Sequence, residues 1–87
     1  MIHFTLPLFW QRYNFLPKQI QDLADKNYAL LRADPFHPSL HFKKVGKNKD
    51  LWAVRVGEHY RALGLDKSEG VVWFRIGTHA EYDKMLT

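Results

Sequence analysis

The sequence contains no cysteine, no long apolar run and only two serines. The absence of cysteine excludes disulfide bonds and thiolate metal sites, and it fits a reducing compartment such as the cytoplasm. A membrane-spanning helix needs about 18 or more consecutive apolar residues, and no stretch approaches that length. The N-terminus also lacks the basic start and apolar core of a signal peptide. We therefore expect a soluble, cytoplasmic protein that makes no membrane contact.

Several catalytic and cofactor motifs are also missing. The chain has neither a glycine-rich phosphate loop nor an HExxH metal motif, and no nucleophile motif surrounds Ser39 or Ser68. His37 and His41 have the i, i+4 spacing that aligns two ligands on a helix, but Pro38 between them argues against that helix. We therefore expect no metal site and no cofactor.

Aromatic side chains are abundant for so short a chain. Of 87 residues, 46% are hydrophobic, and the aromatic residues comprise six Phe, four Tyr and three Trp. Large rings bury much apolar area per residue, which a domain of this size needs in order to fold. We expect one folded domain over residues 1–87.

The net charge of +4 is concentrated in the middle of the chain. Residues 1–39 have four basic and three acidic side chains, residues 40–67 have seven and three, and residues 68–87 have two and three. A concentrated basic zone attracts polyanions such as nucleic acids, because binding releases their counterions. An ordinary solvated surface is the alternative explanation that charge alone leaves open.

The first half of the chain predicts helices. From Leu16 the apolar residues recur at spacings close to 3.6, and this helix should end before Asp34 because Pro35 follows. A short helix over residues 8–14 and an edge strand over residues 2–5 are expected to precede it.

The second half predicts strands. Four candidates are separated by turn-like segments, namely Leu40–Val45, Leu51–Val56, Tyr60–Leu65 and Val71–Ile76. The last is the most apolar run and therefore a candidate central strand. Gly77 is expected to end it, and a short turn of helix should follow with Thr78 as its N-cap.

This order of elements indicates an α+β fold, with two N-terminal helices packed on one face of a mostly antiparallel sheet. Alternation along Leu51–Val56 places Trp52 and Val54 on the face that the helices cover. Arg55 then projects from the other face, which is expected to be uncovered.

Basic side chains near Arg55 indicate a phosphate site. Arg61 opens the next strand, one short turn away, and guanidinium groups bind phosphate with two parallel hydrogen bonds. Lys43 and Lys44 point to opposite faces of their strand, so only one of them can join Arg55, and alternation does not say which. The alternative is that both arginines form structural salt bridges with neighbouring acidic residues.

His79 is the candidate acid/base. It follows the expected central strand, and histidine titrates near pH 6.5, so it can take and return a proton. Tyr82 would share its face in a helix, where a phenol would stack on a base or orient the imidazole. A surface or capping histidine is the alternative. Glu81 and Asp83 alternate with His79, but no partner pattern completes a metal site.

An ordered set of short motifs runs from about residue 4 to residue 86. The motifs are Leu16-Pro17, Asp34–Leu40 followed by Phe42-Lys43, Trp52–Gly57, Tyr60-Arg61 and Trp73–Asp83. Their order resembles the RelE/ParE superfamily of toxins from type II toxin–antitoxin systems. That resemblance implies the same architecture of a helix pair on an antiparallel sheet.

The resemblance also implies an activity. RelE-type members cut messenger RNA without metal, usually on the ribosome, and ParE-type members poison DNA gyrase. An antitoxin wraps and neutralises both types, and the complex often represses its own operon. We therefore expect a toxin that acts as a metal-independent mRNA endoribonuclease and contacts operator DNA only through its antitoxin. The alternatives are a gyrase inhibitor that acts by binding and an inactive toxin-like protein.

Residue roles follow from the resemblance by position. Arg55 and Arg61 resemble the basic strand residues that hold the scissile phosphate. His79 resembles the acid/base or phosphate-contacting position after the last strand, and Tyr82 resembles the C-terminal aromatic residue. These four are the expected catalytic residues.

The expected RNA-binding residues are Lys43, Lys44 and Arg75, with either lysine a looser match than the others. In RelE itself a second basic residue lies two positions before the one that Arg55 matches, and here Ala53 occupies that position. His79 would therefore contribute more of the proton transfer, and its presence favours RNA cleavage over gyrase poisoning.

Overall fold

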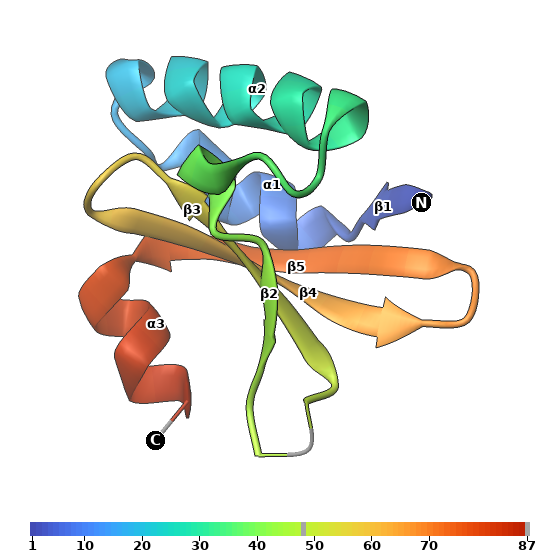
Figure 1. The fold of residues 1–87 in the computed structure, drawn as a ribbon. Coiled ribbons are helices and arrows are strands. Elements are labelled where there is room, and N and C mark those ends of the chain that lie inside the picture. The colour runs from blue at the N-terminus through green and yellow to red at the C-terminus, as the bar shows by residue number, and fades with distance from the viewer. Residues whose placement is uncertain (48, 87) are drawn as a thin grey trace.

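A five-stranded sheet with helices on both of its faces forms the framework of the molecule (Figure 1). The computed structural model describes residues 1–47 and 49–86. In chain order its elements are β1 (His3–Thr5), α1 (Pro7–Asn14), α2 (Lys18–Ala33), the 3-10 helix η1 (Pro38–Leu40), β2 (Lys43–Val45), β3 (Leu51–Val56), β4 (Tyr60–Lys67), β5 (Gly70–Thr78) and α3 (His79–Leu86).

The sheet is antiparallel except at one edge. Its strand order is β1-β5-β4-β3-β2, and β1 pairs with β5 in parallel. Short turns link β3, β4 and β5, so these strands form consecutive hairpins. The strand β5 lies inside the sheet between β1 and β4, as expected for the most apolar run. The predicted α+β class is confirmed.

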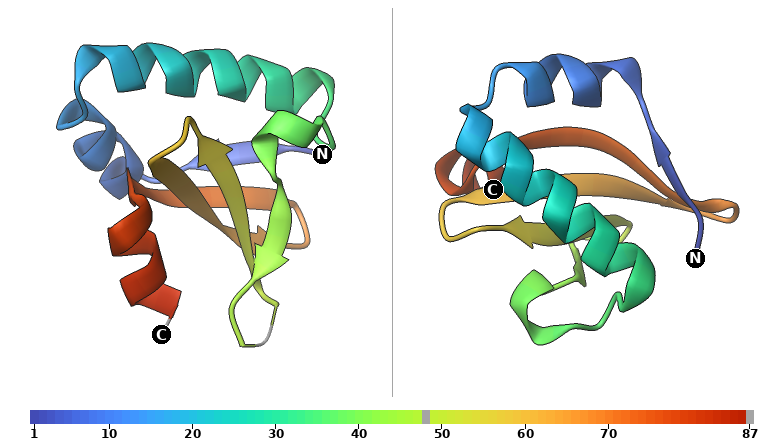
Figure 2. Two further views of the ribbon diagram at one scale, coloured as in Figure 1. Left: turned by 60° about the vertical axis from the view of Figure 1, so that its left-hand side comes forward. Right: turned by 90° about the horizontal axis from the view of Figure 1, so that it is seen from above.

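The N-terminal helices α1 and α2 cover one face of the sheet (Figure 2). The main core lies beneath them, and its buried residues include Leu31, Val54, Val56, Trp73 and Ile76. Trp52 is half-buried against the same cluster. The predicted assignment of Trp52 and Val54 to the helix-covered face is therefore confirmed.

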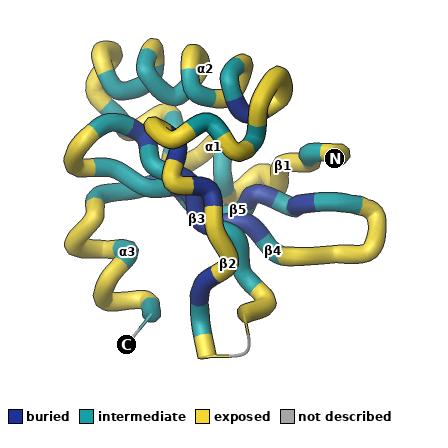
Figure 3. Tube along the Cα trace, viewed as in Figure 1, coloured by how far each residue is buried: buried dark blue, intermediate teal, exposed yellow. Residues whose placement is uncertain are grey.

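The opposite face is not fully open, because α3 packs on part of it. A second buried cluster contains Val45, Ala53 and Leu63, and the α3 residues Tyr82 and Leu86 pack against it. The residue pattern predicts only a short turn of helix here, but α3 has eight residues. The buried segments of the chain lie mainly in the strands, and most of α3 is exposed (Figure 3).

Two strand boundaries differ from their predictions. Gly77 does not end β5, because it still pairs with Arg61 in the ladder and the strand continues to Thr78. The strand expected to begin at Leu40 begins at Lys43, because η1 and the left-handed His41 (φ 47°) precede it. In the first case, pairing with β4 outweighs the tendency of glycine to end a strand. In the second, η1 and the left-handed conformation of His41 keep residues 40–42 out of the strand.

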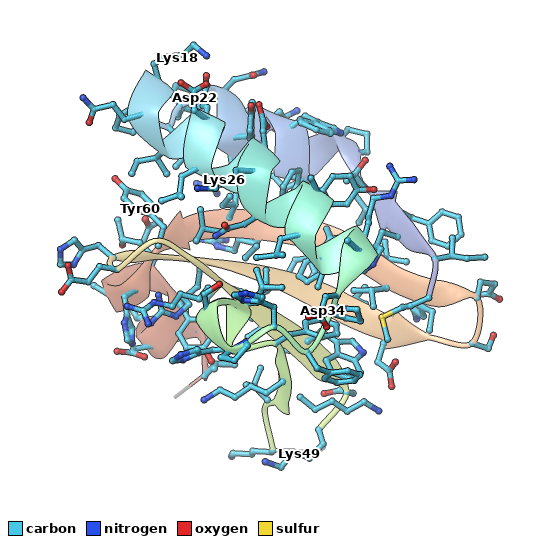
Figure 4. The ribbon with its side chains drawn as sticks, turned by 45° about the horizontal axis from the view of Figure 1, so that its top comes forward. Lys18, Asp22, Lys26, Asp34, Lys49 and Tyr60 are labelled. Carbon is cyan, nitrogen blue, oxygen red and sulfur yellow. The ribbon has the colours of Figure 1, made fainter. Side chains whose placement is uncertain are left out.

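The helix α2 is amphipathic, which explains its place on the surface of the core. Ile20 and Leu23 pack toward the core, whereas Lys18, Asp22 and Lys26 lie along the outer side (Figure 4). Lys18 and Asp22 form an ion pair one turn apart. Among the described residues, none of the helices is both long and apolar enough to span a bilayer.

Gly64 of β4 lies between two tryptophans, Trp52 on β3 and Trp73 on β5. A Cβ atom at this position would lie 2.4 Å from a methyl carbon of Val71 and 3.0 Å from the indole of Trp73. We expect Gly64→Ala to lower the free energy of unfolding by about 1–3 kcal/mol, because overpacking forces neighbouring side chains to move. Urea unfolding followed by tryptophan fluorescence measures this change, and an unchanged midpoint would contradict the packing argument.

His3 of β1 is held by the same tryptophan. Its Nδ1 accepts a hydrogen bond of 3.1 Å from Trp73 Nε1, and the two rings stack with centroids 6.1 Å apart. Burial lowers the pKa of His3 below its ordinary value, and the charges of the N-terminus and Arg32 lower it further. The folded protein therefore favours the neutral imidazole, since a protonated Nδ1 could not accept this bond.

This arrangement predicts stability that depends on pH. The unfolded chain, with a histidine pKa of about 6.5, takes up a proton before the folded protein does. The contribution of His3 is therefore complete above about pH 6.5 and is lost as the pH falls through the lower, folded pKa. We expect the free energy of unfolding to fall as the pH drops below about 6.5, and His3→Gln to weaken this dependence. Identical pH profiles for the two proteins would exclude the proposed role of His3.

Candidate functional site

Four basic side chains lie on the sheet face that also carries α3, and we call this the basic face: Lys43, Arg55, Arg61 and Arg75. Their common orientation follows from the strand register, because directly paired residues of antiparallel strands share a face. Arg55 pairs with Arg61, and the neighbouring position Leu63 pairs with Arg75. The register thus brings together residues from four strands, β2 to β5.

Arg55 and Arg61 lie directly opposite each other on β3 and β4. Both are half-buried, and each donates to a nearby backbone carbonyl: Arg55 Nε to Gly57 O at 3.0 Å, and Arg61 Nη1 to Tyr60 O at 2.8 Å. Among the described residues, neither guanidinium has a carboxylate oxygen within 4 Å. The structural salt bridges that the sequence left open are therefore not formed, and several donors of each arginine remain available to a ligand.

The register also decides between the two lysines of β2. Lys43 pairs with Ala53 and therefore lies on the basic face, where its side chain is exposed. Lys44 pairs with Trp52 on the opposite face. Its Nζ forms an ion pair of 2.7 Å with Asp66 and lies 5.3 Å from the centre of the Trp52 ring. Lys43 is thus the lysine that joins Arg55.

Arg75 differs from the other arginines because an acidic side chain lies beside it. Its Nη2 is 3.9 Å from Glu81 Oε2. Glu81 Oε1 accepts hydrogen bonds from the backbone N–H and the hydroxyl of Thr78, both at 3.1 Å, and Glu81 N donates to that hydroxyl at 3.2 Å. This reciprocal capping box confirms Thr78 as the N-cap of α3.

The spacing Thr78-x-x-Glu81 is a sequence signature of a capping box, and it is the signal from which this role of Glu81 could have been predicted. Hydrogen bonds from Thr78 lower the pKa of Glu81, and the charges of Arg75 and Arg12 lower it further. The carboxylate is therefore charged at neutral pH, and it offsets part of the positive charge of Arg75.

Tyr82 of α3 lies at the edge of the basic face. It is half-buried against the second hydrophobic cluster. With Arg61, Arg75 and Gly77 it lines a recess of about 10 Å³, room for roughly one water molecule. Burial raises the pKa of Tyr82, the positive charge of Arg61 opposes this shift, and Asp83 adds to it. The phenol therefore remains protonated at neutral pH.

His79 is the first residue of α3. Its backbone N–H donates to His59 O at 2.7 Å, which ties the start of the helix to the β3–β4 turn. Its Nε2 lies 3.2 Å from Asp83 Oδ1, and its ring lies 5.8 Å from that of Tyr82, edge to face. The side chain is 47% exposed. Asp83, which is not among the expected site residues, follows His79 at the i, i+4 spacing of helical neighbours.

These contacts connect all four expected catalytic residues. Tyr82 contacts the ring of His79 edge to face and lines the same recess as Arg61, which in turn lies opposite Arg55. Such a set can bind an anion through the arginines and exchange a proton through the imidazole. Within residues 1–47 and 49–86, no group of three His, Asp or Glu side chains is placed to hold a metal ion.

The fold is similar to that of known toxins. One match is a chain of the RelB–RelE antitoxin–toxin complex from Methanococcus jannaschii, with a TM-score of 0.74, 13% sequence identity, and coverage of 97% of this chain and 99% of the other. Another is a copper-bound mutant toxin from Helicobacter pylori, with a TM-score of 0.63, 18% identity, and coverage of 91% and 94%. At these identities the likeness establishes the fold.

Sequence comparison establishes the family. The family model of the ParE-like toxin domain matches residues 18–84, which is most of the chain. No curated protein matches the sequence. The matched region runs from the start of α2 into α3 and includes every residue of the basic face. The chain therefore belongs to the ParE-like toxin family of the RelE/ParE superfamily, the toxins of toxin–antitoxin systems.

Proposed function

We propose that this toxin is a metal-independent endoribonuclease that cleaves messenger RNA in the cytoplasm. The observation that carries the proposal is the pair Arg55 and Arg61, two guanidinium groups on one face with no carboxylate partner among the described residues. His79, whose ring contacts that of Tyr82 beside Arg61, supplies an imidazole that can take up and release a proton. A phosphate diester fits this combination of fixed positive charge and proton transfer.

The proposed reaction uses the nucleophile of the RNA itself. The 2′-hydroxyl attacks the adjacent phosphorus and loses its proton, and the 5′ oxygen of the next nucleotide leaves and gains one. The products are a 2′,3′-cyclic phosphate and a 5′-hydroxyl. His79 transfers a proton in this step, and Arg55 and Arg61 stabilise the charge that develops on the phosphate oxygens. Because RNA supplies the nucleophile, the protein needs neither a serine nor a metal-bound water.

An antitoxin is the proposed protein partner. The neighbour from Methanococcus jannaschii was solved as an antitoxin–toxin complex. We infer that a cognate antitoxin neutralises this chain and that the complex contacts operator DNA through the antitoxin. Messenger RNA bound on the ribosome is the substrate form that the resemblance to RelE implies.

The second candidate function is inhibition of DNA gyrase by binding, which the match to a ParE-like family favours. A gyrase inhibitor needs a contact surface but has no evident use for an acid/base group. The two candidates therefore differ in what they require of His79.

Replacement of His79 tests the enzyme hypothesis. A positioned acid/base contributes about 10²–10⁴-fold to the rate, so His79→Ala should reduce RNA cleavage by that factor and abolish growth arrest. Cleavage is measured by mapping RNA ends after induction. His59→Ala is the matched control, because His59 is exposed at the β3–β4 turn and contacts His79 only through its backbone.

Binding of the antitoxin should survive in both variants, which shows that they are folded. Growth arrest by His79→Ala equal to that of the wild type, with intact transcripts and DNA damage, would reject the nuclease and support gyrase inhibition.

The two lysines of β2 provide a second matched pair. Lys43→Ala should weaken binding of a short single-stranded RNA and reduce the slope of log K against log salt by about 0.7, the value for one phosphate contact on a single strand. Lys44→Ala should leave both unchanged, since Lys44 lies on the opposite face and pairs with Asp66. Fluorescence anisotropy over a range of salt concentrations measures both quantities. Equal effects of the two substitutions would show that the RNA does not lie on the basic face.

A further inference from the structure

A cavity of about 190 Å³ lies between the helices α1 and α2 and the sheet, on the face opposite the basic face. Its walls are mainly apolar and aromatic, with Phe9, Tyr13, Leu31, Val54, Trp73 and Ile76 among them. Protein interiors are close-packed, with few voids larger than a water molecule, and an apolar void lowers stability. A void of this size in an 87-residue chain therefore calls for an explanation.

Most of the polar side chains that line the cavity have hydrogen-bond partners within the protein. Four donors on its walls each bind a protein acceptor: Trp10 Nε1 to Thr5 Oγ1 at 2.9 Å, Tyr13 Oη to Asp25 Oδ1 at 2.8 Å, Trp73 Nε1 to His3 Nδ1 at 3.1 Å, and Asn27 Nδ2 to Arg55 O at 3.1 Å. None of the described lining residues is a lysine or arginine, so an anionic occupant would lose its hydration without gaining a cationic partner, and the carboxylate of Asp25 would repel it.

The cavity has an entrance on the surface. Two of its lining residues, Trp10 and Tyr28, are 47% and 44% exposed. Both are aromatic, so an apolar molecule that enters past either side chain stays in contact with apolar surface. Buried rings on the walls also favour an aromatic occupant, because aromatic pairs in edge-to-face or offset contact gain stability beyond the area that they bury.

We propose that this cavity is a binding site for a compact, neutral aromatic molecule. Its volume sets the size of the ligand, since a dry apolar cavity of about 150 Å³ accommodates benzene. One ring, or a small fused pair such as indole, is therefore the largest occupant that fits without movement of α2. The site is separate from the basic face, and the proposal does not depend on RNA cleavage.

Toluene is the probe for a direct test on the purified full chain. In wild-type protein, increasing toluene should shift the methyl NMR signals of Leu31, Val54 and Ile76 until they saturate. It should also raise the Tm, because a ligand that binds only the folded state stabilises it. Benzoate, which has the same ring and a negative charge, should produce neither effect.

Two alanines of α2 provide matched variants. Ala24 lines the cavity, so Ala24→Leu should fill it, raise the Tm without ligand and abolish the toluene shifts. Ala29 is exposed on the same helix, so Ala29→Leu should bind toluene as the wild type does. Ala62→Val fills the cavity from β4 and replaces Ala24→Leu if that variant does not fold.

Three results would overturn the proposal. Shifts that do not saturate in the wild type would show that no site exists. Equal toluene binding by the Ala24→Leu and Ala29→Leu variants would place the ligand elsewhere. The third result has two parts: toluene does not bind, and Ala24→Leu loses antitoxin binding while Ala29→Leu keeps it. That result would indicate that a side chain of the antitoxin occupies the cavity.

Discussion

The register of β4 between β3 and β5 determines which side chains meet on the basic face. Arg61 lies opposite Arg55 on one side and opposite Gly77 on the other. A slip of one residue would turn every side chain of the strand to the other face. Two glycines help to fix this register: Gly57, at φ +67°, permits the tight turn after β3, and Gly64 leaves the space that the side chains of Val71 and Trp73 occupy. The helix-covered core and the basic face therefore depend on the same pairing.

The same register places two positive charges directly opposite each other. Like charges at paired positions destabilise a sheet, and no carboxylate among the described residues offsets Arg55 or Arg61. Arg75 shows that the fold can supply such a partner, since Glu81 lies beside it. Local rules of stability are broken in natural proteins mainly at functional sites. An anionic ligand would remove the repulsion, so the arrangement is better suited to binding than to stability.

The pattern of apolar, polar and turn-forming residues along the sequence predicts much of the fold but less of the candidate site. The limits of β3 follow from its content of Trp and Val and from the tight turn at residues 57–59, whereas the continuation of β5 through Gly77 depends on a neighbouring strand that local sequence does not reveal. The choice of Lys43 over Lys44 likewise needs the β2–β3 register, because alternation is symmetric between the two faces. Glu81 and Asp83 were within reach of sequence reasoning, since both lie at helical spacings from polar partners, but only if a full helix rather than one turn is assumed.

The β3–β4 turn contacts both arginines, Arg55 and Arg61, and also the first residue of α3, His79. Three backbone carbonyls at this turn accept hydrogen bonds from the site: Gly57 O from Arg55, Tyr60 O from Arg61 and His59 O from the N–H of His79. On the other face, Asn27 of α2 donates a hydrogen bond to Arg55 O, so the helical layer also fixes the position of β3. The two guanidinium groups are therefore positioned by backbone atoms and not by carboxylates. A phosphate that binds them would have no ion pair to break, and it would meet groups whose relative positions are already set.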